Sequence, residues 1–225
     1  KNGLLQGWYM GDLAGKIFPD VFFDQITLLD NSYLAIRKDP FWGIIDNNGN
    51  QILEPKYDTI YHTNYNLFLV GFHGETGVTD TSGKWRSLPR KGKLYMLNDG
   101  RYLISSFNGS HVLNLYGDEL YSSENFLIPL SGGFIAEDYK HKMGLVNASY
   151  NSILPVKYDF IREIDADSVY LFKNENGWGT VYRNGKILFE NDQRFEEIRE
   201  INENYIGVRI NGKYGFVDYL GRLRI

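Results

Sequence analysis

The chain has 225 residues, of which 43% are hydrophobic and 16% aromatic, a composition that excludes global disorder and favours strands. Its formal net charge of −4 gives no global electrostatic reason to bind nucleic acid, and no run of 18 apolar residues could insert into a membrane. The absence of cysteine excludes thiol catalysis, disulfides and cysteine metal sites.

The predicted elements begin with a hairpin that recurs along the chain. In its fullest copy, Trp42 to Gly49, the pair Ile44-Ile45 and the run Gln51 to Leu53 read as two strands around an Asp-x-x-Gly turn. The closing position of the turn recurs every 33 to 36 residues, at Gly15, Gly49, Gly83, Gly117, Tyr150, Gly185 and Gly221. This spacing predicts one array of repeats of about 34 residues over 1–225.

Three columns of residues keep the same register as the turn. The first opens the hairpin, the second follows it directly, and the third begins the turn. We expect an aromatic ring that packs between repeats, a glycine that admits a close neighbour, and a side chain that caps the turn. The residues singled out for these columns are Trp8, Trp42, Trp178 and Tyr214; Gly43, Gly144, Gly179 and Gly215; and Asp46 and Asp218.

The second half of each repeat reads as two more strands. In the fullest copy these are Tyr57 to Ile60 and Leu67 to Val70, and Pro55 is expected to end the strand before them. The best helical candidate is the segment 191–200, although the spacing of Phe195 and Ile198 fits a degenerate third strand equally well. The pattern therefore predicts an all-β protein of tandem antiparallel repeats.

These residues resemble the WG-repeat family of bacterial proteins, named for its Trp-Gly dipeptide. Residues 42–60 match the family pattern nearly throughout, 143–161 match well, and 178–188 and 214–225 match its hairpin half. The resemblance implies a repeated β array used mostly for binding, with no common active site. The copies within 84–130 are degenerate, because Trp85 to Pro89 replaces an apolar strand and no Tyr-Asp pair follows.

One repeat cannot bury its own apolar face, so the copies must stack. A propeller-like toroid and an open β-solenoid both satisfy this requirement. We favour the toroid, because the chain starts and ends in the same phase of the repeat and neither end resembles a polar cap. The sequence begins at Lys1 without an initiator methionine. We therefore expect any signal segment to have been removed, which leaves bacterial cytoplasm and cell envelope both open.

The degenerate copy carries a basic cluster in an acidic chain. The candidate partner-binding residues are Trp85, Arg86, Arg90, Lys91 and Lys93, next to Lys84. The cluster reads either as a solvated basic loop or as a docking patch for an acidic protein, peptide or anionic glycan. Nucleic acid is not expected, because no platform of basic and aromatic residues recurs elsewhere.

The sequence favours a non-catalytic binding or scaffold module that docks a protein or peptide, without cofactor or metal. The four histidines lack the spacing of metal ligands, and no catalytic motif is visible. One alternative is a carbohydrate-binding module that uses exposed aromatic residues such as Trp8, Trp42 and Trp178. Another is a hydrolase in which Asp12, Asp46, Asp80 and Asp218 converge on a central cavity. The oligomeric state stays open.

Overall fold

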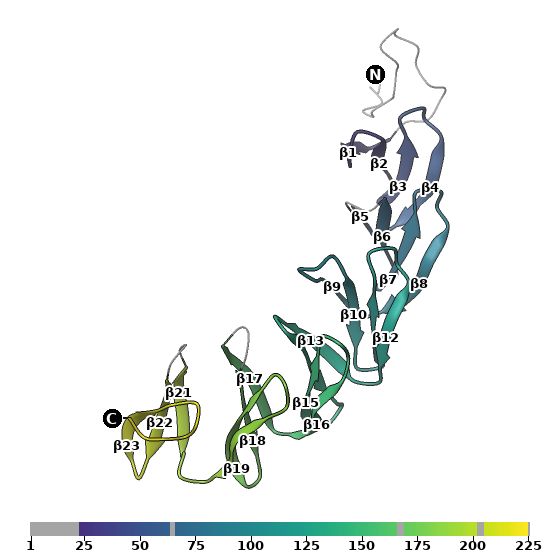
Figure 1. Ribbon diagram of the computed structural model, residues 1–225. Coiled ribbons are helices and arrows are strands. Elements are labelled where there is room, and N and C mark those ends of the chain that lie inside the picture. Colours follow the sequence, from purple (N-terminus) through teal and green to yellow (C-terminus); the bar gives the residue numbers. More distant parts are fainter. Residues whose placement is uncertain (1–22, 64–65, 166–168, 202–204, 225) are drawn as a thin grey trace. The chain divides into compact units, whose positions relative to one another are not determined.

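The computed structural model describes residues 23–63, 66–165, 169–201 and 205–224 (Figure 1). Over these residues it contains 23 strands and no helix, which confirms the all-β prediction. The strands form six antiparallel sheets, and within each sheet consecutive strands are neighbours. The chain divides into two compact units, residues 1–104 with 111–120 and residues 105–110 with 121–225.

Sheets 1 and 2 lie in the first unit, and the boundary between the units falls within sheet 3. Sheet 1 comprises β1 (Gln25–Leu28), β2 (Tyr33–Lys38), β3 (Phe41–Asp46) and β4 (Gln51–Tyr57). Sheet 2 comprises β5 (Thr59–His62), β6 (Leu67–Phe72), β7 (Glu75–Asp80) and β8 (Trp85–Lys91). Sheet 3 comprises β9 (Lys93–Met96), β10 (Tyr102–Ser106), β11 (Gly109–Leu113) and β12 (Glu119–Ser123). The degenerate copies thus build the same four-stranded sheet as the others.

The second unit contains sheets 4, 5 and 6. Sheet 4 comprises β13 (Phe126–Leu130), β14 (Gly133–Glu137), β15 (Met143–Asn147) and β16 (Ser152–Tyr158). Sheet 5 comprises β17 (Phe160–Asp165), β18 (Val169–Asn174), β19 (Gly177–Tyr182) and β20 (Ile187–Asp192). Sheet 6 comprises β21 (Glu197–Ile201), β22 (Ile206–Ile210) and β23 (Lys213–Val217). The segment 191–200 is therefore the end of one strand and the start of another, and the helical alternative is wrong.

Each sequence repeat contributes to two sheets. The Trp-Gly hairpin supplies the third and fourth strands of one sheet, and the following half-repeat supplies the first and second strands of the next. The expected strand from Tyr57 to Ile60 is therefore split, because β4 ends at Tyr57 and β5 begins at Thr59. Asp58 occupies the corner, where its backbone N–H donates to the Gly71 carbonyl at 2.9 Å and its carboxylate accepts from the His73 N–H at 2.6 Å.

Pro55 lies inside β4 and does not end it, contrary to expectation. Ile44 pairs with Leu53 and Trp42 with Tyr57, so the single residue Gly43 faces a three-residue bulge that contains Pro55. The proline costs no ladder hydrogen bond there, because the bulged residues have no paired residue on β3. The bulge brings backbone close to Gly43, where a Cβ atom would lie 2.6 Å from the Leu53 carbonyl oxygen.

The other glycines of this column lie in the same place on the third strand of their sheets. A Cβ atom on Gly144 would lie 2.8 Å from the Leu154 carbonyl oxygen, and one on Gly179 would lie 2.7 Å from the Phe189 carbonyl oxygen. Gly215 pairs with Val208 on β22. Close approach of the bulged fourth strand therefore explains the glycine at positions 43 and 144. At position 179 the Phe172 ring lies closer still, 2.3 Å from such a Cβ atom.

The core of the first unit lies between sheets, and the second strand supplies it on both faces. Phe68 and Val70 of β6 pack with Ile44 and Leu53 of sheet 1. The alternate residues, Leu67 and Leu69, pack with Tyr102 and Ile104 of sheet 3. Successive side chains of a strand point to opposite faces, so a continuous apolar run serves two interfaces at once.

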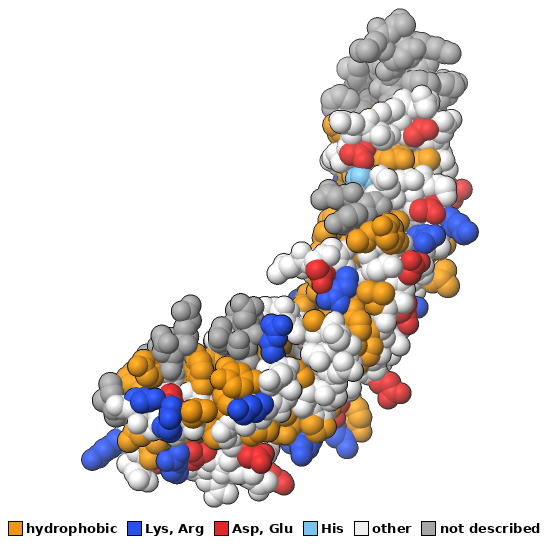
Figure 2. Space-filling model, viewed as in Figure 1, with side chains coloured by type: hydrophobic (Ala, Val, Ile, Leu, Met, Phe, Trp, Pro, Cys, Tyr) orange, Lys and Arg blue, Asp and Glu red, His pale blue; other side chains and the backbone are white. Residues whose placement is uncertain are grey.

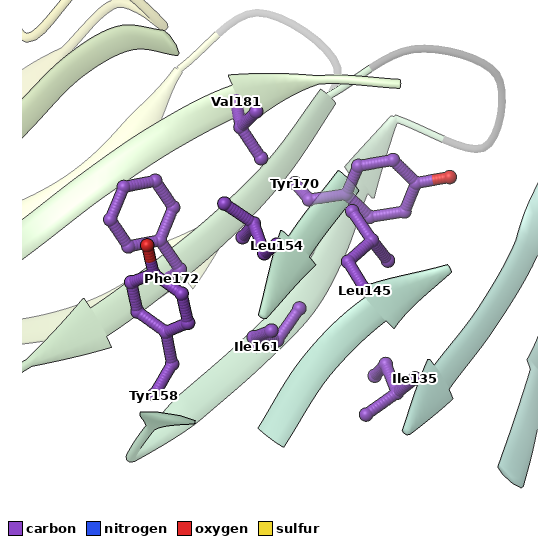
Figure 3. Close-up of a cluster of buried hydrophobic side chains, with 8 residues drawn as sticks. All are labelled: Ile135, Leu145, Leu154, Tyr158, Ile161, Tyr170, Phe172 and Val181. Atoms are coloured by element: carbon purple, nitrogen blue, oxygen red, sulfur yellow. The ribbon is translucent and has the colours of Figure 1, made fainter. Parts of the chain in front are cut away.

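The second unit repeats this arrangement (Figure 3). Tyr170 and Phe172 of β18 pack against sheet 4, where Leu145 and Leu154 lie in the same cluster. Leu171, between them in sequence, packs on the other side of sheet 5. Its buried partners there are Phe195, just before β21, and Ile206, Val208 and Val217 of sheet 6. Each fully buried side chain of this kind contributes about 1.5–3 kcal/mol to stability.

The Asp or Asn that begins the hairpin turn caps it. Asp46 Oδ1 accepts from the backbone N–H groups of Asn48 and Asn50, both at 2.8 Å. The same two contacts recur at Asp80, Asn114, Asn147 and Asp218. Burial pushes the pKa of Asp46 upward, but the hydrogen bonds from Asn50 and Asn48 outweigh it and hold the pKa below its usual range. At the closing position, Gly49 has φ 83° and Tyr150 has φ 65°.

Replacing Gly43 with valine should destabilise the protein by about 2–4 kcal/mol, because the new side chain meets the bulged backbone of β4. Urea unfolding followed by tryptophan fluorescence measures the change. Gly185→Asn is the control, because no atom lies within 4 Å of a Cβ there and asparagine tolerates its φ of 87°. Equal unfolding midpoints for both variants would contradict the bulge assignment.

Asp46→Asn should preserve the turn, as Asn114 and Asn147 do in their copies, but should alter the pH dependence of stability. A carboxyl with a lowered folded-state pKa adds stability above its unfolded pKa of about 3.9 and loses it as pH falls through the folded value. The variant should therefore be less stable than the parent at pH 7, with the difference shrinking toward pH 3. Urea midpoints across that range provide the measurement, and a pH-independent difference would refute the explanation.

Candidate functional site

Strand β8 departs from β4 in the polarity of its side chains. In β4, Ile52 and Leu53 pack against sheet 2, and Tyr57 is buried across from Trp42. The corresponding residues of β8 are Arg86, Ser87 and Arg90, the last of which lies across from Thr76. Where β4 has the exposed Glu54, β8 has Leu88, which is 65% exposed. Compared with β4, β8 has polar residues in place of apolar ones on its core face and an apolar residue on its solvent face.

The two arginines of β8 are paired within the chain. Arg86 donates to the Asp118 carboxylate at 3.1 Å and to the Tyr116 carbonyl at 3.2 Å. Arg90 donates to the Glu119 carboxylate at 2.7 Å, and His111 contacts the same carboxylate oxygen at 3.0 Å. These contacts join β8 to the turn between β11 and β12, so they stabilise the packing of sheet 2 on sheet 3. The side chains are partly exposed, and each pair contributes about 0–1 kcal/mol.

Trp85 is part of the core between sheets 1 and 2. Its ring packs edge-on against Tyr57, with 6.3 Å between ring centroids. The ring also covers Gly77, where a Cβ atom would lie 2.6 Å from it. Trp85 therefore stabilises the array and offers little surface to a partner.

The remaining candidates are accessible. Lys84, Leu88, Lys91 and Lys93 are exposed along β8 and at its junction with β9, and we call these four residues the β8 surface. Within the described residues no ion pair involves the three lysines. Lys91 lies across from Glu75 on β7, and the Lys93 ammonium lies 4.8 Å from the centre of the Tyr95 ring. The structure thus divides the basic cluster into a paired half and an unpaired half.

Of the described residues in the aromatic column, only Trp178 packs in a cluster between sheets. Trp178 packs in the cluster between sheets 5 and 6, with its ring 5.7 Å from that of Phe160. Trp42 is partly buried, with the Arg37 guanidinium 5.9 Å from its ring centre. Tyr214 is 57% exposed, and the Arg199 guanidinium stacks on it at 4.7 Å. Trp8, like Asp12 and Gly15, lies outside the described residues.

The described aspartates of the turn column, Asp46, Asp80 and Asp218, all have lowered pKa values. For Asp80 and Asp218, as for Asp46, burial raises the pKa but hydrogen bonds outweigh it and leave the pKa lowered. At Asp218 these bonds come from Arg222, Arg224 and the N–H of Leu220. A general acid requires the opposite shift. Within the described ranges no group of three or more His, Asp and Glu side chains is placed to hold a metal ion.

Two hollows of moderate size lie on the surface. One of about 320 Å³ adjoins the turn between β9 and β10, and its carboxylate, Asp99, is paired with Arg101 at 2.6 Å. The other, of about 240 Å³, lies on sheet 6 beside Arg199, Tyr214 and Phe216. Neither brings together two carboxylates from the described residues, as glycoside hydrolysis requires.

A group of exposed aromatic residues in the second unit was not predicted. Phe107 is 48% exposed at the β10–β11 turn, and Tyr139 is 75% exposed at the β14–β15 turn. Phe107 stacks on Phe126 with 5.0 Å between ring centroids and meets His141 edge-on at 6.1 Å. We call Phe107, Tyr139 and His141 the turn-tip aromatics. The repeat columns singled out from the sequence do not include the turns between second and third strands, so periodicity gave no signal for these residues.

Charged side chains of both signs are interspersed with hydrophobic ones over the face shown in Figure 2. Because the two signs are mixed, the face in view has no extended region of purely positive or purely negative electrostatic potential. The described part of the chain contains no helix long and apolar enough to cross a membrane.

Solved structures similar to this chain include BamB from Moraxella catarrhalis, with 14% identity over 86% of this chain and 70% of that one, and a TM-score of 0.39. Kluyveromyces lactis Hsv2p has 8% identity over 85% and 72% of the two chains, with a TM-score of 0.40. AztD from Citrobacter koseri has 13% identity over 94% and 74%, also with a TM-score of 0.40. No curated protein matches the sequence.

The WG-containing repeat family matches the chain at two segments, residues 42–74 and 183–214. The first runs from the opening tryptophan of one hairpin into the next sheet, and the second spans the junction of sheets 5 and 6. The resemblance inferred from the sequence is thereby confirmed, and the chain carries WG-containing repeats.

Proposed function

We propose that the protein is a non-catalytic binding module that docks a protein or peptide on its repeat surface. Repeat arrays expose broad surfaces built from simple units, and the individual repeats are free to diverge where a partner binds. The observation that carries the proposal is the reversed polarity of β8, which places Leu88 in solvent between unpaired lysines.

Stability alone does not account for this strand. Ser87 occupies the place of a buried leucine, and its buried hydroxyl lacks a hydrogen-bond partner within the described residues. Such a change forfeits about 1.5–3 kcal/mol of apolar burial and adds the cost of an unsatisfied polar group. Exposed apolar residues framed by polar ones are typical of protein interaction sites. We infer that the cost is retained because the surface of β8 has a partner.

Affinity capture with the purified chain tests the proposal. Leu88→Glu should reduce recovery of specific partners from a lysate of the source organism at least tenfold, because it replaces the apolar contact with a charge. Lys157→Glu, at an exposed position of the fourth strand β16, is the matched control and should leave recovery unchanged. Equal recovery with both variants would count against docking at β8.

We also propose, as the sequence favours, that the array closes into a propeller-like ring. Small-angle X-ray scattering distinguishes this from an open solenoid. A compact chain of this length has a radius of gyration of about 17 Å, and a ring should lie close to that value. A clearly larger radius with an extended distance distribution would favour the solenoid.

A carbohydrate-binding module is the second candidate, and the turn-tip aromatics favour it. An exposed aromatic face suits stacking on a sugar ring, and Phe107 is held in place by Phe126. Phe107→Ala combined with Tyr139→Ala should then abolish glycan-array binding while Leu88→Glu leaves it intact. Binding that survives the double change would exclude the turn-tip aromatics as the site, and no glycan binding by the parent chain would remove this candidate.

A further inference from the structure

We propose that the β8 surface recognises an acidic segment of a partner protein that carries one large apolar side chain. This inference rests on the proposed docking function and specifies the chemistry of the partner.

Only basic side chains that are not paired within the chain are available to the carboxylates of a partner. Of the five basic residues between positions 84 and 93, Arg86 and Arg90 are paired with Asp118 and Glu119. Lys84, Lys91 and Lys93 remain exposed. On the neighbouring strand β7, Glu75 lies across from Lys91, and the Asp80 carboxylate is occupied by the backbone of its own turn. Carboxylates from outside can therefore approach three ammonium groups that have no strong internal partner.

The spacing of the β8 surface sets the spacing expected in the partner. A strand rises about 3.3 Å per residue, so Lys84 lies at most about 13 Å before Leu88, and Lys91 at most about 10 Å after it because the bulge shortens the rise. An extended segment would meet both lysines with carboxylates three or four residues on either side of its apolar residue. Pro89 lacks an N–H and lies in the bulge of this edge strand, so recognition depends on side chains more than on strand addition.

A second copy of this chain is the less suitable occupant. Three carboxylates within residues 192–197 of the chain are already paired. Asp192 pairs with Arg194, Glu197 with Arg199 and Glu196 with Arg209. Using these carboxylates between molecules would require breaking contacts within the chain. These contacts favour a different protein as the source of the complementary charge.

Fluorescence anisotropy with three labelled 12-residue peptides tests this inference on the full chain. The first peptide has a central leucine with glutamates three and four residues to either side, in a serine background. The second replaces the leucine with serine, and the third replaces the glutamates with lysine. We expect the first to bind at least tenfold more tightly than the others, and to lose at least tenfold in affinity between 50 and 300 mM NaCl.

Variants locate the site. Leu88→Glu and the double variant Lys91→Glu, Lys93→Glu should each weaken the first peptide at least tenfold, whereas Lys157→Glu should not. All these side chains are exposed, so unchanged melting temperatures verify that the fold is intact.

Equal binding of all three peptides would overturn the inference. If no peptide binds but Leu88→Glu still abolishes partner capture, the acidic chemistry is wrong and the docking function stands. If neither experiment responds to Leu88→Glu, both fail. Concentration-dependent self-association that Lys91→Glu abolishes, measured by analytical ultracentrifugation, would assign the surface to a second copy and likewise overturn the inference.

Discussion

The structure depends on burial of the second strand of a sheet from both sides, as at β6 and β18. Residues 67–70 are buried without a break because alternate side chains enter different interfaces. No single sheet can satisfy such a strand, since one of its faces would always remain in water. Packing between neighbouring sheets is therefore a condition for each sheet to exist, and the turns and bulges serve to place those sheets at packing distance.

The parts of the fold that are local in sequence could be predicted. An Asp-x-x-Gly turn requires an acceptor at its first position and a left-handed conformation at its last, and both are readable at Asp46 and Gly49. The sequence also indicated that asparagine can replace aspartate at the first position, and Asn114 does accept the same hydrogen bonds as Asp46. Tyr150 adopts the left-handed conformation without being glycine, and its ring stacks on Tyr121 with 4.7 Å between centroids.

The parts that depend on distant contacts could not be predicted. Pro55 looked like the end of a strand, but the bulge that accommodates it forms because β4 bends over Gly43. The basic cluster looked uniform, because the acids that divide it lie about 30 residues later in the chain. Trp85 looked like a possible contact residue until its packing on Tyr57 placed it in the core. In the candidate site, the sequence showed which residues are basic, but it did not show which of them form ion pairs within the chain.

The offset between sequence repeat and sheet bears on how such arrays grow. One repeat spans the junction between two sheets, from the Trp42 hairpin of one to the apolar strand of the next. Tandem duplication of this segment in a gene would therefore introduce a complete junction, with both of its packing surfaces encoded together. Lineages can lengthen or shorten the array without first evolving a matching neighbour, while a single copy such as β8 remains free to diverge.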